Sequence, residues 1–233
     1  MPSGRSLETG LTLGDVDVDG AILEGIECVH GDSRSAFLRK ATIGGAALLG
    51  VLALPPAGKA QSAKDVDILN YALTLEYLQA AFYTEAEQVR ALRGRARRAV
   101  EVVGAVERAH VTAFRDALGR AAVARPTFNF RGVTENQTQF LRTAVAFEDL
   151  AVAAYKGQAP RLASDALLAV AVSIHSVEAR HAAWMRYLFD ITPAANAFDE
   201  PLSRPEVLRI VASTNFIAAA GRTEREGTPR FTG

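Results

Sequence analysis

Two copies of the pattern Glu-x-x-His lie within long apolar stretches of this chain, and each copy follows another apolar stretch with one central glutamate. The six residues are Glu76, Glu107, His110, Glu148, Glu178 and His181. Apolar residues around them recur at steps of three and four, which predicts that all six lie on the buried faces of helices. The chain must therefore fold so that four carboxylates and two imidazoles fit inside one helical core.

The same periodicity predicts an all-α fold with four long helices. Their approximate ranges are 65–92, 96–121, 134–156 and 163–190. A long connection with Pro126 and Gly132 separates the second helix from the third, and Gly157 and Pro160 are predicted to break the pattern before the fourth. We therefore expect a four-helix bundle over 61–190, preceded by an extension and signal segment over 1–60. A tail over 191–233 follows, with one short helix near 206–212, on the outside of the bundle or extending from it.

The two halves of the predicted bundle resemble each other. The segment around Glu76 matches the segment around Glu148 at an offset of 72 residues, and Glu107 matches Glu178 at an offset of 71. Two helix hairpins related by a pseudo-twofold axis would place the four glutamates symmetrically.

The spacing within each Glu-x-x-His pair is suited to metal binding. Residues three apart on a helix project from the same face, with β-carbons about 5 to 6 Å apart. Four ionised glutamates inside a bundle would each lose several kcal/mol of hydration, whereas a whole domain is stable by only about 5 to 15 kcal/mol. Two divalent cations would cancel the four negative charges, so we predict that all six residues are metal ligands, with Glu107 and Glu178 as the bridging carboxylates.

The donor set also indicates which metals to expect. One Glu from each of two helices and Glu-x-x-His from each of the other two is the arrangement of di-iron and di-manganese carboxylate bundles. Oxygen donors with two imidazoles suit iron or manganese better than copper or structural zinc. The single cysteine, Cys28, excludes an internal disulfide and a thiolate cluster. We expect two ions, with iron ahead of manganese.

Three further side chains near the glutamates have two interpretations each. Tyr83 and Tyr155 each lie seven residues beyond a central glutamate, where a phenol can hydrogen-bond to a ligand, undergo oxidation or only pack in the core. His175 lies three residues before Glu178, and its counterpart in the first half is Gly104. That lack of a repeat favours a supporting or packing role for His175 over a role as ligand.

The beginning of the chain predicts export. A charged stretch over 33–40 precedes 14 apolar residues, from Ala41 to Leu54, and small residues follow, which is the order found in secretory signals. The charged part resembles a twin-arginine motif, except that Ser35 stands where the second arginine is expected. We expect a periplasmic or cell-envelope protein, with membrane attachment only if the signal remains uncleaved.

Charge excludes another class of partner. The chain of 233 residues has 26 basic and 26 acidic side chains and a formal net charge of zero. Nucleic-acid-binding proteins usually have a clustered basic excess. We therefore expect no nucleic acid as partner.

The amino-acid sequences of the first and fourth predicted helices resemble those of a known family. The segment from Leu69 to Tyr83 and the Glu178-Ala-Arg-His181 motif resemble the ferritin-like superfamily, and within it an exported bacterial family related to plant desiccation-associated proteins. The resemblance implies a four-helix bundle with a long crossover between its second and third helices, and a dinuclear metal site.

Ferrous oxidation and peroxide dismutation need no separate reductase, which suits an exported protein. The expected function is therefore a dinuclear redox protein that consumes peroxide or oxidises ferrous iron, a ferroxidase or catalase-like oxidoreductase. Its partner would be a small oxidant, O₂ or hydrogen peroxide. A homo-oligomer is a possible assembly. The alternative is a non-catalytic envelope stress or desiccation-type protein whose metal site is structural or vestigial.

Overall fold

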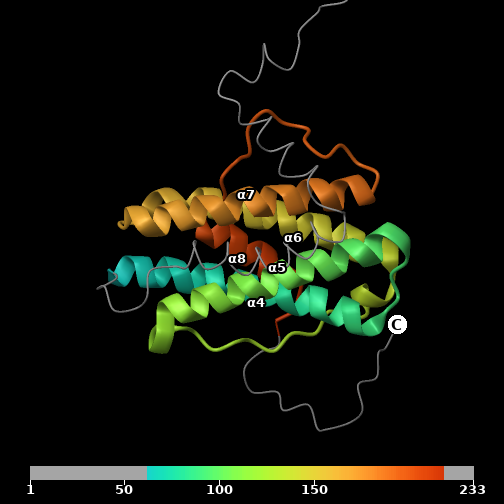
Figure 1. The fold of residues 1–233 in the computed structure, drawn as a ribbon, viewed down its shortest axis with the longest axis horizontal. Coiled ribbons are helices and arrows are strands. Elements are labelled where there is room, and N and C mark those ends of the chain that lie inside the picture. Colours follow the sequence, from blue (N-terminus) through green and yellow to red (C-terminus); the bar gives the residue numbers. More distant parts are fainter. Residues whose placement is uncertain (1–61, 218–233) are drawn as a thin grey trace, which may run out of the picture. The chain divides into compact units, whose positions relative to one another are not determined.

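The computed structural model describes residues 62–217, which form an all-helical unit (Figure 1). Its α-helices are α4 (Ala63–Val89), α5 (Gly94–Leu118), α6 (Gln137–Gln158), α7 (Asp165–Leu188) and α8 (Arg204–Ser213). The predicted signal segment and extension over 1–60 lie outside the described residues. Within 62–217, none of the helices is both long enough and apolar enough to cross a membrane.

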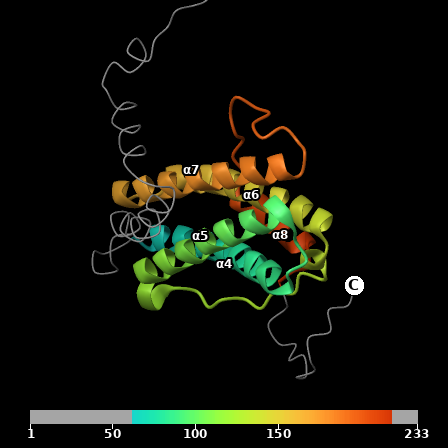
Figure 2. The ribbon, with the colours of Figure 1, turned by 45° about the vertical axis from the view of Figure 1, so that its right-hand side comes forward.

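The four long helices form two antiparallel hairpins, α4 with α5 and α6 with α7. One hairpin lies over the other in both views, and the connection between α5 and α6 follows the length of the bundle (Figures 1 and 2). The predicted four-helix bundle and its long crossover are confirmed. The bounds of these four helices differ from the prediction by two or three residues at each end. The second helix, for example, ends as an α-helix at Leu118 and continues as a 3-10 helix over Gly119–Ala121.

Local sequence explains where the helices begin. The side chains of Ser62, Asn136 and Ser164 each accept a hydrogen bond from a backbone N–H in the first turn of α4, α6 and α7 respectively. Such caps satisfy donors that have no partner inside the helix. Before α8, Ser203 and Glu206 form a reciprocal capping box. The caps of α4, α6 and α7 fix where these helices begin and thereby the heights of Glu76, Glu148 and Glu178 in the bundle, whereas α5 begins without a side-chain cap.

Apolar side chains enclose the central glutamates from both ends of the bundle. At one end, Leu73, Phe114 and Ile174 belong to one buried cluster. At the other, Phe82 and Met185 belong to a second, larger cluster. Each of these residues lies within two turns of a central glutamate or histidine on its own helix, so the carboxylates occupy a polar layer between two apolar ones.

The described part of the tail, up to Ile217, returns to the bundle instead of extending from it. Val207 and Val211 of α8 are 0% and 3% exposed, and they join the larger apolar cluster. Before α8, the backbone N–H of Leu202 donates to the carbonyl of Ala153 on α6 at 3.1 Å. The tail helix is therefore part of the folded core, on the α6 side of the bundle.

The prediction that Gly157 breaks the helix is wrong, because α6 continues to Gln158. Gly157 instead lets the tail approach: a Cβ there would lie 2.0 Å from the carbonyl oxygen of Leu202. Such a distance is far inside van der Waals contact, so a side chain at this position would displace the tail. The helix ends one residue later and a 3-10 helix with Pro160 follows.

Candidate metal centre

All six glutamates and histidines singled out by the sequence are buried, and their side chains meet in one cluster. Glu76, Glu107, Glu148 and Glu178 are each 0% exposed, and His110 and His181 are 6% and 5% exposed. They come from all four bundle helices. We refer to these six residues as the central cluster.

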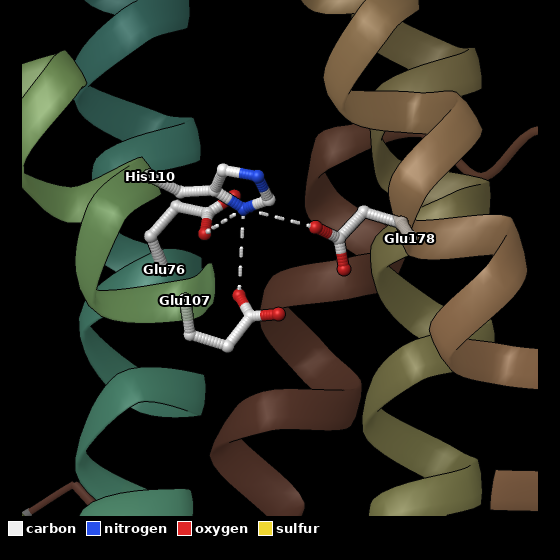
Figure 3. Close-up of side chains that lie close together, drawn as sticks. All are labelled: Glu76, Glu107, His110 and Glu178. Carbon is white, nitrogen blue, oxygen red and sulfur yellow. Dashed lines mark ion pairs between the residues drawn. The ribbon is translucent and has the colours of Figure 1, made fainter. Parts of the chain in front are cut away.

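One half of the central cluster surrounds His110. Its Nδ1 atom lies 3.3 Å from Glu76 Oε2 and 3.2 Å from Glu178 Oε1. Glu107, one turn earlier on the same helix, brings Oε2 to 3.6 Å from the same nitrogen. Figure 3 shows the three carboxylates pointing toward the imidazole from three helices, so their donor atoms converge on a single point.

The other half surrounds His181. Its Nδ1 atom lies 2.9 Å from Glu107 Oε1 and 3.7 Å from Glu148 Oε2. Glu178 contributes Oε2 at 3.9 Å. Glu107 and Glu178 therefore belong to both halves, with one oxygen facing each histidine. These are the two carboxylates that the sequence analysis expected to bridge.

Burial and mutual repulsion change the acidity of the cluster. Burial, followed by the charge of neighbouring carboxylates, raises the pKa of Glu107 and of Glu178 to about 8. The same causes raise the pKa of Glu148 well above its usual range. For Glu76, burial alone would raise the pKa, but the imidazolium of His110 outweighs it and lowers the pKa. Without a cation, the cluster thus holds protons on most of its carboxylates near neutral pH.

Several of the oxygen and nitrogen atoms that could bind a metal ion make no hydrogen bond. Both oxygens of Glu107 and Glu178, Oε2 of Glu76 and Nδ1 of both histidines are buried without a hydrogen bond of suitable geometry among residues 62–217, although the charged groups lie as close as 2.9 Å. Buried polar atoms are normally satisfied, and each exception needs an explanation. In each half, one histidine and three glutamates offer ligand atoms within 4.8 Å of one another. The residues therefore fit metal ions, which would satisfy these atoms together.

Tyr83 and Tyr155 support the cluster instead of only packing beside it. The Tyr83 phenol donates a hydrogen bond to Glu148 Oε1, and the Tyr155 phenol donates one to Glu76 Oε1. Burial, followed by the charge of the accepting carboxylate, raises the pKa of both phenols well above the usual range, so both stay protonated as donors. Each tyrosine orients the glutamate of the other hairpin.

Gln79 is a polar residue of this site that the sequence analysis missed. It is 3% exposed, and its Nε2 donates to Glu148 Oε2 at 3.1 Å. The signal was present, because Gln79 is a polar residue on the apolar stretch one turn after Glu76, while the repeat places Ala151 at the equivalent position. The pseudo-twofold symmetry therefore extends to the two tyrosines but is broken at Gln79.

His175 does not join the central cluster, as its missing repeat suggested. Its counterpart Gly104 lies in a tight position, because a Cβ there would be 3.0 Å from the Cβ of Tyr83 and would also require the flexible Glu87 carboxylate, 2.4 Å away, to move. The absence of a side chain there lets α5 approach α4 closely, beside the tyrosine that contacts Glu148.

Comparison with known proteins agrees with the geometry. No curated protein matches the chain. The family model described as a ferritin-like domain matches residues 64–190, which is more than half of the chain and includes the whole central cluster. With a bundle of two hairpins, a long crossover and buried carboxylates that could hold metal, the chain belongs to the ferritin-like domain family.

Proposed function

We propose that this protein is a dinuclear metal redox protein of the cell envelope, which oxidises ferrous iron or consumes peroxide. The observation that carries the proposal is the sharing of Glu107 and Glu178 by two groups of ligand atoms, one at each histidine. Each of two bound ions would have one imidazole and one glutamate that does not contact the other ion, Glu76 in one half and Glu148 in the other. Glu107 and Glu178 would be available to both ions.

Charge and ligand type favour iron, with manganese second. Four carboxylates carry four negative charges, which two divalent cations neutralise, and the ions would offset the loss of hydration that burial imposes on the carboxylates. Carboxylate oxygen and imidazole nitrogen suit iron and manganese, and the set has no thiolate to favour softer metals.

The protein's own residues would hold and orient this pair of ions. Glu76 and His110 would bind one ion, Glu148 and His181 the other, and the tyrosines would fix the outer oxygens of Glu76 and Glu148. When bound, the metals would supply the electron transfer. Ferrous oxidation would convert two ferrous ions, one dioxygen and two protons into two ferric ions and one hydrogen peroxide. In dismutation, one peroxide is oxidised to dioxygen while another is reduced to water.

Metal analysis with turnover assays tests the proposal. The purified chain should bind two ions and show ferrous oxidation or peroxide dismutation. The double variant Glu107→Gln, Glu178→Gln keeps the shape of both side chains while removing both bridging charges, so it should fold and lose metal. Glu101→Ala, which changes an exposed glutamate of α5, is the matched control and should load normally.

Each other outcome has a defined meaning. Two ions without turnover would assign the structural role instead, and a chain that binds none after anaerobic loading would refute the metal centre. A double variant that still binds two ions would show that the bridging assignment is wrong.

A further inference from the structure

A small apolar cavity adjoins the central cluster at one end of the bundle. Its volume is about 20 Å³, and its walls come from α4, α5, α6 and α7. The lining is almost entirely aliphatic or aromatic and includes Ala72, Phe114, Ala154, Tyr155 and Ile174.

The cavity lies one helical turn from the proposed ligands. Ala72 precedes Glu76 by four residues, Phe114 follows His110 by four, and Ile174 precedes Glu178 by four. Residues four apart lie above one another on the same helix face. Tyr155 completes the connection, because it lines the cavity while its phenol donates to Glu76.

The pseudo-twofold repeat shows that this space is specific to one end of the bundle. Ala154 corresponds to Phe82 in the first hairpin at the offset of 72 residues. Phe82 is 0% exposed and its ring stacks on Phe140 with centroids 4.7 Å apart. An aromatic ring thus fills one end, and the small side chain of Ala154 leaves room at the other.

Two lining residues have buried polar atoms available to an occupant. The Tyr71 hydroxyl and the Gln158 Nε2 are buried without a hydrogen-bond partner among residues 62–217. Burial raises the pKa of Tyr71 to about 12, against the opposing charge of Arg204, so its phenol stays protonated. The Tyr71 hydroxyl can donate and accept a hydrogen bond and the Gln158 amide nitrogen can donate one, so these two groups mark where water would compete for the space.

We propose that this cavity is a binding site for dioxygen beside the metal centre, which makes dioxygen the oxidant of the proposed function on which this inference rests. A volume near 20 Å³ admits about one molecule of a few atoms. Dioxygen loses no strong hydrogen bonds on leaving water, whereas hydrogen peroxide would lose most of its own among apolar walls. A stable water needs two to four polar partners, and Tyr71 and Gln158 offer two such groups, whereas the side chains of Phe114, Ala154 and Ile174 offer none.

Xenon binding tests the site without any catalytic assay. Crystals of the full chain, metal-free and metal-loaded, are pressurised with xenon, an apolar probe. Xenon should appear between Phe114, Ala154 and Ile174 in both forms. Ala154→Leu should abolish this site, whereas Ala146→Leu, at an exposed position on the same helix, should retain it. Absence of xenon in the native chain, or an ordered water on Tyr71 and Gln158 that excludes it, would overturn the proposal.

Rapid mixing then tests whether the site serves the metal centre. Protein loaded anaerobically with ferrous iron is mixed with dioxygen or with hydrogen peroxide, and formation of ferric iron is followed. Ala154→Leu should slow the dioxygen reaction several-fold with little effect on the peroxide reaction, while Ala146→Leu behaves like the native chain. Equal slowing with both oxidants, or an unchanged dioxygen rate, would contradict the proposal. A native chain that binds xenon but does not oxidise iron would refute ferrous oxidation and leave the gas site standing.

Discussion

The Tyr155 phenol on α6 donates a hydrogen bond to Glu76 on α4, a residue of the opposite hairpin. The repeat reproduces the contact in reverse, since Tyr83 on α4 donates to Glu148 on α6. In each case the bonded oxygen is Oε1, while Oε2 faces the histidine of its half at 3.3 or 3.7 Å. The tyrosines therefore leave the inner oxygen of each glutamate directed toward the proposed ions.

Removing this phenol should weaken metal binding without unfolding the bundle. In Tyr155→Phe, the ring remains and Glu76 loses the donor that holds its outer oxygen. Loss of such supporting hydrogen bonds commonly lowers metal affinity by about 10- to 100-fold. Titration with manganese, followed by metal analysis, should show weaker loading of one ion. Tyr77→Phe is the control, because within the described part of the chain that hydroxyl makes one long hydrogen bond, 3.5 Å to the carbonyl of Val123. Equal affinities in both variants would assign Tyr155 to packing alone.

Gln79 should make the two metal positions unequal. Its amide donates to Glu148 Oε2, the oxygen that faces His181, whereas Glu76 Oε2 has no hydrogen-bond partner among the described residues. An ion near His181 must compete with this amide, so we expect two loading steps, with the position near His110 filled first. Gln79→Leu removes the donor at similar volume, and the two steps should move closer together in a calorimetric titration. A native chain that loads both ions in one step would contradict this asymmetry.

The sequence was sufficient to predict the bundle and its polar layer. Helical periodicity placed four helices, and the repeat placed Glu76 and Glu148 at equivalent positions, because helix geometry and internal symmetry are local properties of the chain. The same logic identified Tyr83 and Tyr155 as candidates. It could not decide between packing and hydrogen bonding, since the acceptor of each phenol is a glutamate of the other hairpin.

Contacts between segments that are distant along the chain could not be predicted from the sequence. Gly157 was interpreted as a helix breaker, yet its function is to admit the Leu202 backbone, 45 residues later in the chain. Gln79 was overlooked because its significance depends on Glu148, a partner on another helix. Neither relationship leaves a periodic pattern, so both required the coordinates.

Metal removal should make stability depend on pH. In the metal-free protein, burial holds the pKa of Glu107 and Glu178 at about 8, above the value of 4.5 for an unperturbed glutamate. A raised pKa in the folded state gives stability at low pH that is lost as pH rises through the folded value. Between these two values the unfolded chain binds fewer protons than the folded one, so stability should fall from about pH 4.5 to about pH 8.

Thermal unfolding measured across that range checks the prediction. The midpoint of the metal-free chain should fall with increasing pH, and metal loading should reverse the trend, because cations bind the ionised carboxylates. The variant Glu107→Gln, Glu178→Gln removes both groups and should flatten the profile of the metal-free chain. A metal-free native chain whose midpoint rises with pH would mean that the carboxylates are already ionised in the folded state.

Gly157→Ala should detach the tail while sparing the metal centre. The new Cβ would lie 2.0 Å from the Leu202 carbonyl, a backbone atom that cannot move without shifting the segment before α8. Displacement would expose Val207 and Val211, and burial of each such side chain contributes about 1.5 to 3 kcal/mol. Hydrogen exchange should therefore increase over α8, and the free energy of unfolding should fall by a few kcal/mol. Metal content should stay unchanged, because Glu148 lies more than two helical turns before Gly157. Native exchange rates over α8 in this variant would show that the tail can rearrange around the added methyl group.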